Sequence, residues 1–436
     1  MMKGRRLFLF LGMQMCFWSG MAQTKVVTLE ELFQCIDAYN RNVKSGELQI
    51  KQSEAAIEVA KNDRLPSLQL SADWRYIGDG FTTERNFSHV ERADMPHAGN
   101  SFLLKATQVV YQGGAISRNI ERSKIQKKVA EDRLHKTRQD VRFLLLGHYL
   151  DIFQLSNQKK VYERNIEQTR LLVRDMEAAY RQGTALKSDI TRYELQLQNV
   201  QLRLTHVQNQ MDILNHQLVT SIDWPVTTVI EPDTTMLKQT AVERIPEKSW
   251  IEKAQDAPQM RLARAQVDLS KNSEQLLKAG MRPHLFLKAE HEFSGPILVE
   301  VPAIDKNFGF WSAGVGLSYN IDALYRNRRK LKQNKLEQLD MQEKAALVEE
   351  ELLNDIHEAY VNLDEAYVRL ETQKKSVQLA HENYFIVKQR YMNGQALITD
   401  MLDASNTQLE MELELANAQI GILYQYYLLR KVTGIL

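Results

Sequence analysis

Ten residues near the middle of the chain recur in similar form near its end. The segments Tyr180–Asp189 and Tyr391–Asp400 lie 211 positions apart and share Tyr, Gly, Ala-Leu and Asp at the same places. Each copy sets a glycine, Gly183 or Gly394, inside a long helical pattern. Glycine adopts left-handed backbone angles without steric cost, as a tight turn between antiparallel helices requires. The pattern therefore indicates a tandem duplication built around two helical hairpins.

The first 22 residues differ in character from the rest. Three basic residues within the first six positions precede the apolar run Leu7–Trp18, and small residues follow at Gly20 and Ala22. This order predicts a signal peptide over residues 1–22, cut before Gln23. A membrane anchor is the alternative, but the apolar run is shorter than the roughly 20 residues of a spanning helix.

Cysteine usage and charge narrow the class further. Cys16 lacks the neighbouring residues of a lipoprotein site, so removal of the signal leaves Cys35 alone, and we expect no internal disulfide. The 56 basic and 55 acidic residues nearly balance, so the sequence gives no sign of a nucleic-acid partner.

Long stretches without proline predict long helices. His97–Trp224 and Ala303–Leu436 contain no Pro and are rich in Leu, Gln, Glu, Arg and Ala. A capping box at Thr28 and Glu31 starts one helical segment, and Pro258 is expected to be the first residue of the main helix in another. The predicted segments are 28–63 and 247–279, the long arms 115–181 and 324–392, each roughly 100 Å long, and the returning arms 185–221 and 396–431.

Between these helices the periodicity changes to two. Strands are expected near 68–76 and 102–111 in the first repeat, and near 285–292 and 309–319 in the second. One face of each is largely apolar and the other polar or small, with aromatic residues near the ends. A half-buried sheet of a soluble protein is one interpretation. Strands of about ten residues joined by the long loops 77–101 and 294–308 better fit a bilayer-spanning barrel with a polar lumen.

Four strands cannot close a barrel, because the smallest such barrels have about eight. An open edge in lipid leaves backbone groups unpaired, so the chain is expected to oligomerise. Three chains give twelve strands, whereas two give eight and a narrow, filled lumen. The predicted organisation is a signal peptide over 1–22, repeat 1 over 23–222, a connection over 223–246 and repeat 2 over 247–436.

With this order established, the sequence resembles the TolC-like family of outer-membrane efflux proteins over essentially the whole mature chain. The resemblance rests on the duplicated helix, strand hairpin, long helix, Tyr-x-x-Gly-x-Ala-x-x-x-Asp turn and return helix, and on Gln108–Gly114 leading into the first long helix. It implies a mixed α/β membrane protein, in which long helical hairpins form a trimeric α-barrel and four transmembrane strands per chain contribute to a 12-stranded β-barrel.

The resemblance also implies a function and a place. Such a protein is a passive trimeric duct across the outer membrane and periplasm, gated at its periplasmic tip and serving an inner-membrane transporter through a periplasmic adaptor protein. The expected location is the outer membrane, with an extension into the periplasm. The sequence does not identify the cargo, since drugs, metals and secreted polypeptides all fit such a duct.

The second turn resembles the family's periplasmic tip, where a ring of Asp lines the closed aperture. Asp400 and Asp403 are the candidate aperture residues, and their three-residue spacing puts both on one helix face. The alternative is that Asp400 caps or solvates a helix start and that Asp403 is an ordinary surface carboxylate.

A latch is the second element that the resemblance implies. Tyr391 and Asp189 resemble positions that help to hold neighbouring tip helices closed, whereas packing at the turn is an equally simple role for Tyr180 and Tyr391. The sequence departs from the family pattern at Ala396, where some members carry an Arg. A latch here is expected to be weaker, or to use Arg390 or Arg181.

Other classes of protein fit less well. None of the ten His forms a His-Glu-x-x-His pair, and neither a Gly-x-Ser-x-Gly elbow nor a phosphate-binding loop occurs, so we expect no enzyme, catalytic residue, cofactor or bound metal. Apolar residues at coiled-coil spacing also fit an exported coiled-coil structural or adhesion protein without channel activity, but that class does not explain the strands.

Overall fold

The computed structural model describes residues 24–233, 245–300 and 302–436. The predicted signal peptide and positions 234–244 of the predicted connection lie outside them. The chain divides into two compact units. Unit 1 contains the described parts of Met1–Arg41, Asp140–Arg244 and Ala359–Leu429, and unit 2 those of Asn42–Gln139, Ile245–Glu358 and Arg430–Leu436. No helix in the described ranges is both long and apolar enough to cross a membrane.

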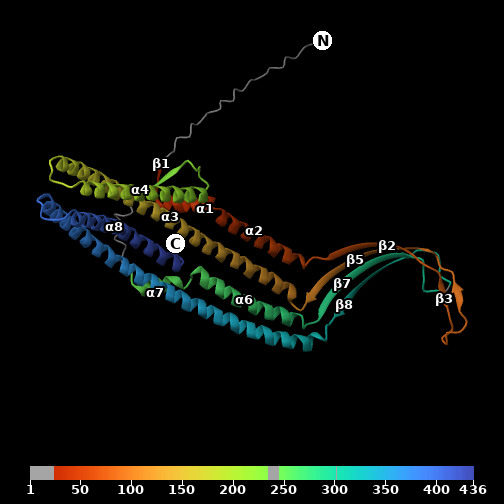
Figure 1. The fold of residues 1–436 in the computed structure, drawn as a ribbon. Coiled ribbons are helices and arrows are strands. Elements are labelled where there is room, and N and C mark those ends of the chain that lie inside the picture. Colours follow the sequence, from red (N-terminus) through yellow and green to blue (C-terminus); the bar gives the residue numbers. More distant parts are fainter. Residues whose placement is uncertain (1–23, 234–244, 301) are drawn as a thin grey trace, which may run out of the picture. The chain divides into compact units, whose positions relative to one another are not determined.

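Helices form most of the structure, and Figure 1 labels the elements along the chain. Those of the first repeat are β1 (Thr24–Val27), α1 (Leu29–Tyr39), α2 (Arg41–Asn62), β2 (Ser67–Tyr76), β3 (Gly80–Thr82), β4 (Glu91–Ala93), β5 (Ala98–Gln112), α3 (Ala115–Arg181) and α4 (Lys187–Ser221), followed by β6 (Val229–Pro232). The remainder are α5 (Glu247–Ala254), α6 (Pro258–Ala279), β7 (His284–Gly295), β8 (Phe308–Ser318), α7 (Ala323–Met392) and α8 (Ile398–Val432). The four long and returning arms thus lie within a few residues of their predicted bounds.

The first helical segment begins as predicted but does not continue as one helix. The side chains of Thr28 and Glu31 form the expected capping box at the start of α1. The single helix expected over 28–63 is wrong, because Asn40 adopts an extended backbone and separates α1 from α2. Its side chain instead donates a hydrogen bond to the carbonyl of Ser221, 3.1 Å away. This long-range bond explains a break that no local signal marks.

The corresponding segment of the second repeat is also broken, and here the sequence signal is clear. α5 ends at Ala254, and Pro258 is the first residue of α6, as predicted. Proline fits this position because the first helical residue has no intrahelical partner for its N–H.

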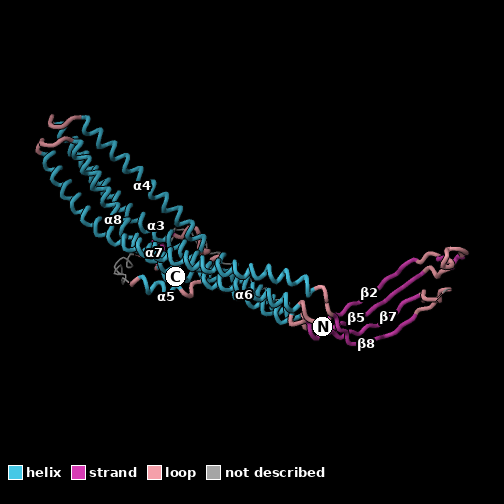
Figure 2. Tube along the Cα trace, turned by 90° about the horizontal axis from the view of Figure 1, so that it is seen from below, coloured by secondary structure: helices cyan, strands magenta, loops and turns pink. Residues whose placement is uncertain are grey.

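Four strands of unit 2 form one antiparallel sheet with the order β2-β5-β7-β8. Figures 1 and 2 show these strands side by side, each continuing within a few residues into α2, α3, α6 or α7. The register pairs Leu70 with Leu104 and Ala289 with Ala313. β2 and β8 each pair on one side only among the described strands, so both edges of the sheet are open in a single chain.

The apolar face of the sheet is also open. Leu68, Leu70 and Trp74 of β2 are each at least 70% exposed. A half-buried soluble sheet would cover this face with another element, and no described part of the chain does so. The predicted loop over 77–101 contains a feature that was not expected, since β3 and β4 pair as a short antiparallel ribbon.

Unit 1 contains a second, smaller sheet that the periodicity did not predict. β1 and β6 pair in parallel, with Thr24 opposite Val229. The hydroxyl of Tyr149 in α3 donates to the carbonyl of Val27 at 2.8 Å and accepts from the N–H of Asp233 at 3.0 Å. Burial raises the pKa of Tyr149 to about 12. One buried phenol therefore joins both strands to the long helix.

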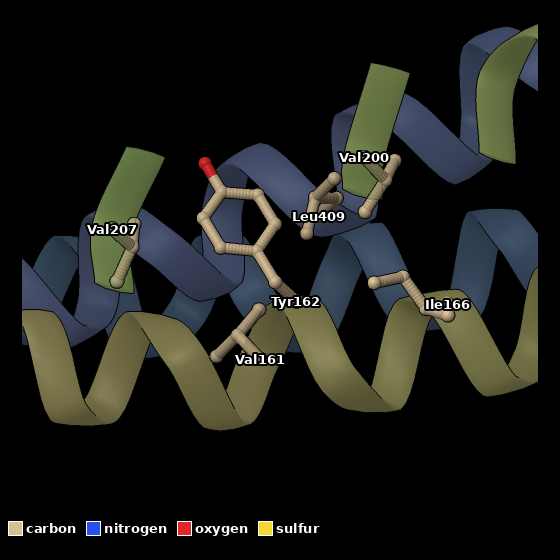
Figure 3. Close-up of a cluster of buried hydrophobic side chains, with 6 residues drawn as sticks. All are labelled: Val161, Tyr162, Ile166, Val200, Val207 and Leu409. Atoms are coloured by element: carbon tan, nitrogen blue, oxygen red, sulfur yellow. The ribbon is translucent and has the colours of Figure 1, made fainter. Parts of the chain in front are cut away.

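The helices of unit 1 pack through apolar side chains. Figure 3 shows Tyr162 of α3 among side chains of α4 and α8. The buried members of this cluster are Val161, Tyr162, Ile166, Val200, Val207 and Leu409. The cluster joins the hairpin of the first repeat to the returning helix of the second, so residues far apart in sequence share one core.

Candidate functional site at the helical turns

The two duplicated turns adopt the same backbone conformation. Gly183 has a φ of 77° and Gly394 a φ of 70°. In the first turn, the N–H groups of Gly183 and Thr184 bond to the carbonyls of Tyr180 and Ala179. In the second turn, those of Gly394 and Gln395 bond to the carbonyls of Tyr391 and Arg390. Both are Schellman motifs, in which the left-handed residue is glycine for steric reasons.

The candidate aperture residues lie at the start of α8. A carboxylate oxygen of Asp400 accepts a hydrogen bond from the N–H of Leu397 at 3.0 Å. Asp400 therefore does cap its helix start, where a negative charge also interacts favourably with the helix dipole. The side chains of Asp400 and Asp403 are both exposed. Capping uses one oxygen of Asp400, which leaves its charge open to solvent.

The candidate latch residues of the two repeats meet in this structure. Burial, followed by the negative charge of Asp189, raises the pKa of Tyr391. Asp189 is itself half-buried, at the third position of α4. Tyr180 is 47% exposed and lies outside the cavity that Asp189 and Tyr391 line. The duplicated tyrosines therefore have different surroundings.

A cavity of about 430 Å³ lies between the two turns. Both turn glycines, Asp189, Tyr391 and Ala396 line it. The absence of an Arg side chain at Ala396 thus leaves open space at this point. Arg390 does not reach across, since its guanidinium donates to the carbonyl of Gln395 in its own turn, 3.4 Å away.

An apolar cluster adjoins the cavity and contributes part of its lining. Its buried members are Leu172, Met176, Tyr193 and Met401, and Tyr384 and Tyr391 pack against them. Burial raises the pKa of Tyr193, and its hydroxyl has no hydrogen-bond partner among the described residues. Burial likewise raises the pKa of Tyr384. Separating the two hairpins here would expose this cluster to water.

The sequence did not single out Tyr193, Tyr384 or Met401. Position 404, which corresponds to Tyr193 in the second repeat, is an alanine. The repeat therefore gives no signal for Tyr193. Its burial depends on side chains of α3 and α8, and the sequence alone does not show that these helices meet α4 at this point.

Comparison with known proteins gives a family and several related folds. The family described as outer membrane efflux protein matches residues 32–222 and 251–434. No curated protein matches. Among solved structures, the outer-membrane channel OprN is 16% identical with a TM-score of 0.72, and the match covers 93% of this chain and 89% of that one.

Two further structures have similar folds. The outer membrane protein VceC from Vibrio cholerae is 14% identical with a TM-score of 0.74, and the match covers 93% of this chain and 96% of that one. The outer membrane channel CmeC from Campylobacter jejuni is 14% identical with a TM-score of 0.72, over 93% and 85%. At these identities the likeness concerns the fold.

Proposed function

Because this chain belongs to the outer membrane efflux protein family, we propose that its role as an efflux channel of the outer membrane is carried out by a trimer, with a passive duct extending into the periplasm. The observation that carries the proposal is the four-stranded sheet of unit 2, with both edges unpaired among the described strands and an exposed apolar face. In lipid, β2 and β8 need partners. Another copy of the chain offers both.

Three copies give a closed sheet of twelve strands, and this number is preferred over eight for a physical reason. A barrel of about eight strands has an interior just large enough for its own side chains. The polar and small side chains of the second face, such as Ser312 and Gly314 of β8, line a water-filled passage better in a wider barrel. The proposed strands per chain are β2, β5, β7 and β8.

The proposal assigns the turns to the gate. Asp400 and Asp403 of three chains would surround one axis with six carboxylates, which attract cations and repel one another. Asp189 and Tyr391 would hold neighbouring hairpins together, supported by the cluster around Tyr193 and Met401. Opening then requires the turns to separate, with driving energy from a periplasmic adaptor and an inner-membrane transporter.

The repeats have separate parts in this proposal. Repeat 1 (23–222) and repeat 2 (247–436), joined by the connection 223–246, supply equivalent hairpins. Only repeat 2 carries the carboxylate pair, because position 192, which corresponds to Asp403, is an arginine. An exported coiled-coil structural or adhesion protein is not favoured, since it would have no use for a sheet with an exposed apolar face.

Oligomeric state and conductance test the proposal together. The full chain, which has a mass of 50.5 kDa before signal removal, should migrate as a heat-modifiable trimer after extraction in detergent. It should also form pores in planar bilayers. A stable dimer with no conductance would overturn the twelve-stranded duct. A monomer that needs no detergent would overturn membrane insertion as well.

A further inference from the structure

The start of α7 carries a concentrated positive charge. Residues 323–336 include six basic side chains and no acidic one. All six are exposed, namely Arg326, Arg328, Arg329, Lys330, Lys332 and Lys335. The whole chain has a net charge of only +1. The cluster is therefore a local feature, and we call it the α7 basic cluster.

Four members of this cluster lack an acidic partner within the described ranges. Arg326 pairs with Asp322 at 3.1 Å, and the charge of Lys335 acts on Glu274. The described part of the chain offers no ion pair to Arg328, Arg329, Lys330 or Lys332. Such a group of like charges is unfavourable by itself. A negatively charged partner from outside the chain would stabilise it.

At each of the corresponding ends of the other three helices, at least one cation has an acidic partner within the chain. Near the end of α2, Lys61 pairs with Glu58 at 2.7 Å, and near the start of α3, Arg118 pairs with Glu121 at 2.6 Å. Near the end of α6, Lys278 pairs with Glu274 at 2.6 Å. Among these four helix ends, three consecutive cations without an acidic partner in the described part of the chain, Arg328, Arg329 and Lys330, occur only at the start of α7.

The position of the cluster points to the surface of the membrane. β8 ends at Ser318, and α7 begins at Ala323. Ser318 pairs with His284, the first residue of β7, at the end of the strands that is nearest to the helices. Tyr319 and Tyr325 are exposed between the apolar strand and the basic side chains. Apolar strand, exposed tyrosine and basic residue follow one another as they do where a membrane protein leaves the hydrocarbon region.

The helix geometry leaves the cluster free for a partner. Asn334 and Gln338, on the packed face of α7, bond to Ser270 and Glu274 of α6. Arg328, Lys332 and Lys335 follow one another at intervals of four and three residues, so they share a different face. Within about two turns, this face presents its three cations in a row along the helix.

We propose that the α7 basic cluster binds the headgroups of anionic phospholipids in the leaflet on the helix side of the sheet. The proposal rests on the four strands crossing the membrane, as under the proposed function. Basic clusters of four to eight residues beside a membrane-spanning segment attract anionic lipid, on the order of fivefold for each cation near the surface. The phosphate group supplies the negative charge that the chain lacks here.

Lipid retention tests the proposal with the full chain in nanodiscs of equal phosphatidylglycerol and phosphatidylcholine. Native mass spectrometry after mild extraction should show phosphatidylglycerol retained over phosphatidylcholine by at least about fivefold. The variant with Arg328, Arg329, Lys330 and Lys332 all replaced by Gln should retain the two lipids almost equally. A matched control replaces four other exposed cations of the same helix by Gln, namely Lys344, Arg369, Lys374 and Lys375, and should behave as wild type.

Several outcomes would overturn the proposal. These are equal retention by wild type, an unchanged preference in the fourfold Gln variant, or displacement by inorganic phosphate well beyond that by sodium chloride at equal ionic strength, which would indicate a free-anion site. Loss of the trimer without a change in lipid preference would assign the cluster to a contact between copies. A change in ion selectivity without a change in lipid preference would assign the cluster to the lumen.

Two further measurements keep the test decisive if the fourfold variant fails to assemble. The preference of the wild-type protein should fall toward one as salt is raised. The charge-retaining variant with Arg328→Lys and Arg329→Lys should keep the preference for phosphatidylglycerol at low salt. Conductance is recorded in parallel, so that failure of lipid binding in a conducting trimer counts against this inference alone.

Discussion

Asp189 in one helical hairpin lies close to Tyr391 in the other, and after burial it is the charge of this carboxylate that raises the Tyr391 pKa. Their duplicated counterparts, Tyr180 and Asp400, are used differently. Tyr180 is about half exposed, and Asp400 caps its own helix. A single chain therefore uses one member of each duplicated pair at the contact between its repeats.

Removing the Tyr391 hydroxyl should loosen this contact. Tyr391→Phe keeps the ring in the apolar cluster and removes only the polar group beside Asp189. The hydroxyl is one of the polar groups between the two hairpins, beside the charge of Asp189, so open probability in planar bilayers should rise severalfold when it is removed. Tyr180→Phe, the same change at the duplicated position, is the control and should have little effect. Equal effects from both would show that the Tyr391 surroundings are irrelevant to gating.

Replacing the candidate aperture carboxylates should remove block by multivalent cations. Asp400→Ala with Asp403→Ala takes away six charges in a trimer, and block measured in planar bilayers should weaken strongly. Asp403→Ala alone separates charge from capping, because Asp400→Ala also removes the hydrogen bond from the N–H of Leu397, a contribution of about 0.5–1.5 kcal/mol. The control changes Asp355 and Asp364, two exposed carboxylates of α7. Unchanged block in the double variant would remove Asp400 and Asp403 from the aperture.

Replacing glycine by alanine should change the free energy of unfolding in opposite directions at two kinds of position. Gly394 has open space where a Cβ would lie but a φ of 70°, so Gly394→Ala should destabilise by about 1–2 kcal/mol. Gly147 lies within α3, also with open space, and Gly147→Ala should stabilise by about 0.5–1 kcal/mol. Thermal unfolding of the two variants in detergent measures both. Stabilisation by Gly394→Ala would contradict the turn geometry.

Stability at alkaline pH should depend on Tyr149. Its folded pKa of about 12 lies above its ordinary value of 10.0, because burial disfavours the phenolate. Its contribution is therefore complete below about pH 10 and is lost as pH rises toward 12. Tyr149→Phe should lower the free energy of unfolding at neutral pH by about 1–2 kcal/mol through two lost hydrogen bonds, and should flatten the decline above pH 10. An unchanged alkaline decline would assign it to other groups.

The alternation in β2 predicts which face meets lipid. Leu70→Arg should reduce membrane assembly, since an arginine on the lipid face costs about 2–4 kcal/mol near the bilayer midplane. Ser71→Arg, one residue further along the same strand, should be tolerated in the lumen. The amount of heat-modifiable oligomer in outer-membrane fractions reports both. The reverse order would invert the assignment of the two faces.

Features with a local chemical cause were predictable from the sequence. The capping box at Thr28, the proline start of α6 and the two glycine turns each depend on backbone requirements that a few neighbouring residues express. The break at Asn40 and the pairing of β1 with β6 depend on partners about 180 to 205 positions away, and short periodicity does not detect such partners. At the site, Asp189 and Tyr391 were named through the family resemblance of the duplicated turns, whereas Tyr193, which is not duplicated, was missed.

The pairing of β1 with β6 also bears on the order of assembly. Residues 24–27 find their strand partner only at residues 229–232, after α3 and α4 have been made. The N-terminal strand therefore cannot pair before the whole first repeat has been made. Its pairing with β6 does not complete the core of unit 1, because Leu409 of α8 belongs to the same buried cluster as Tyr162 and Val200. The two halves of the duplicated chain therefore depend on each other for a finished core, and neither is an independent folding unit.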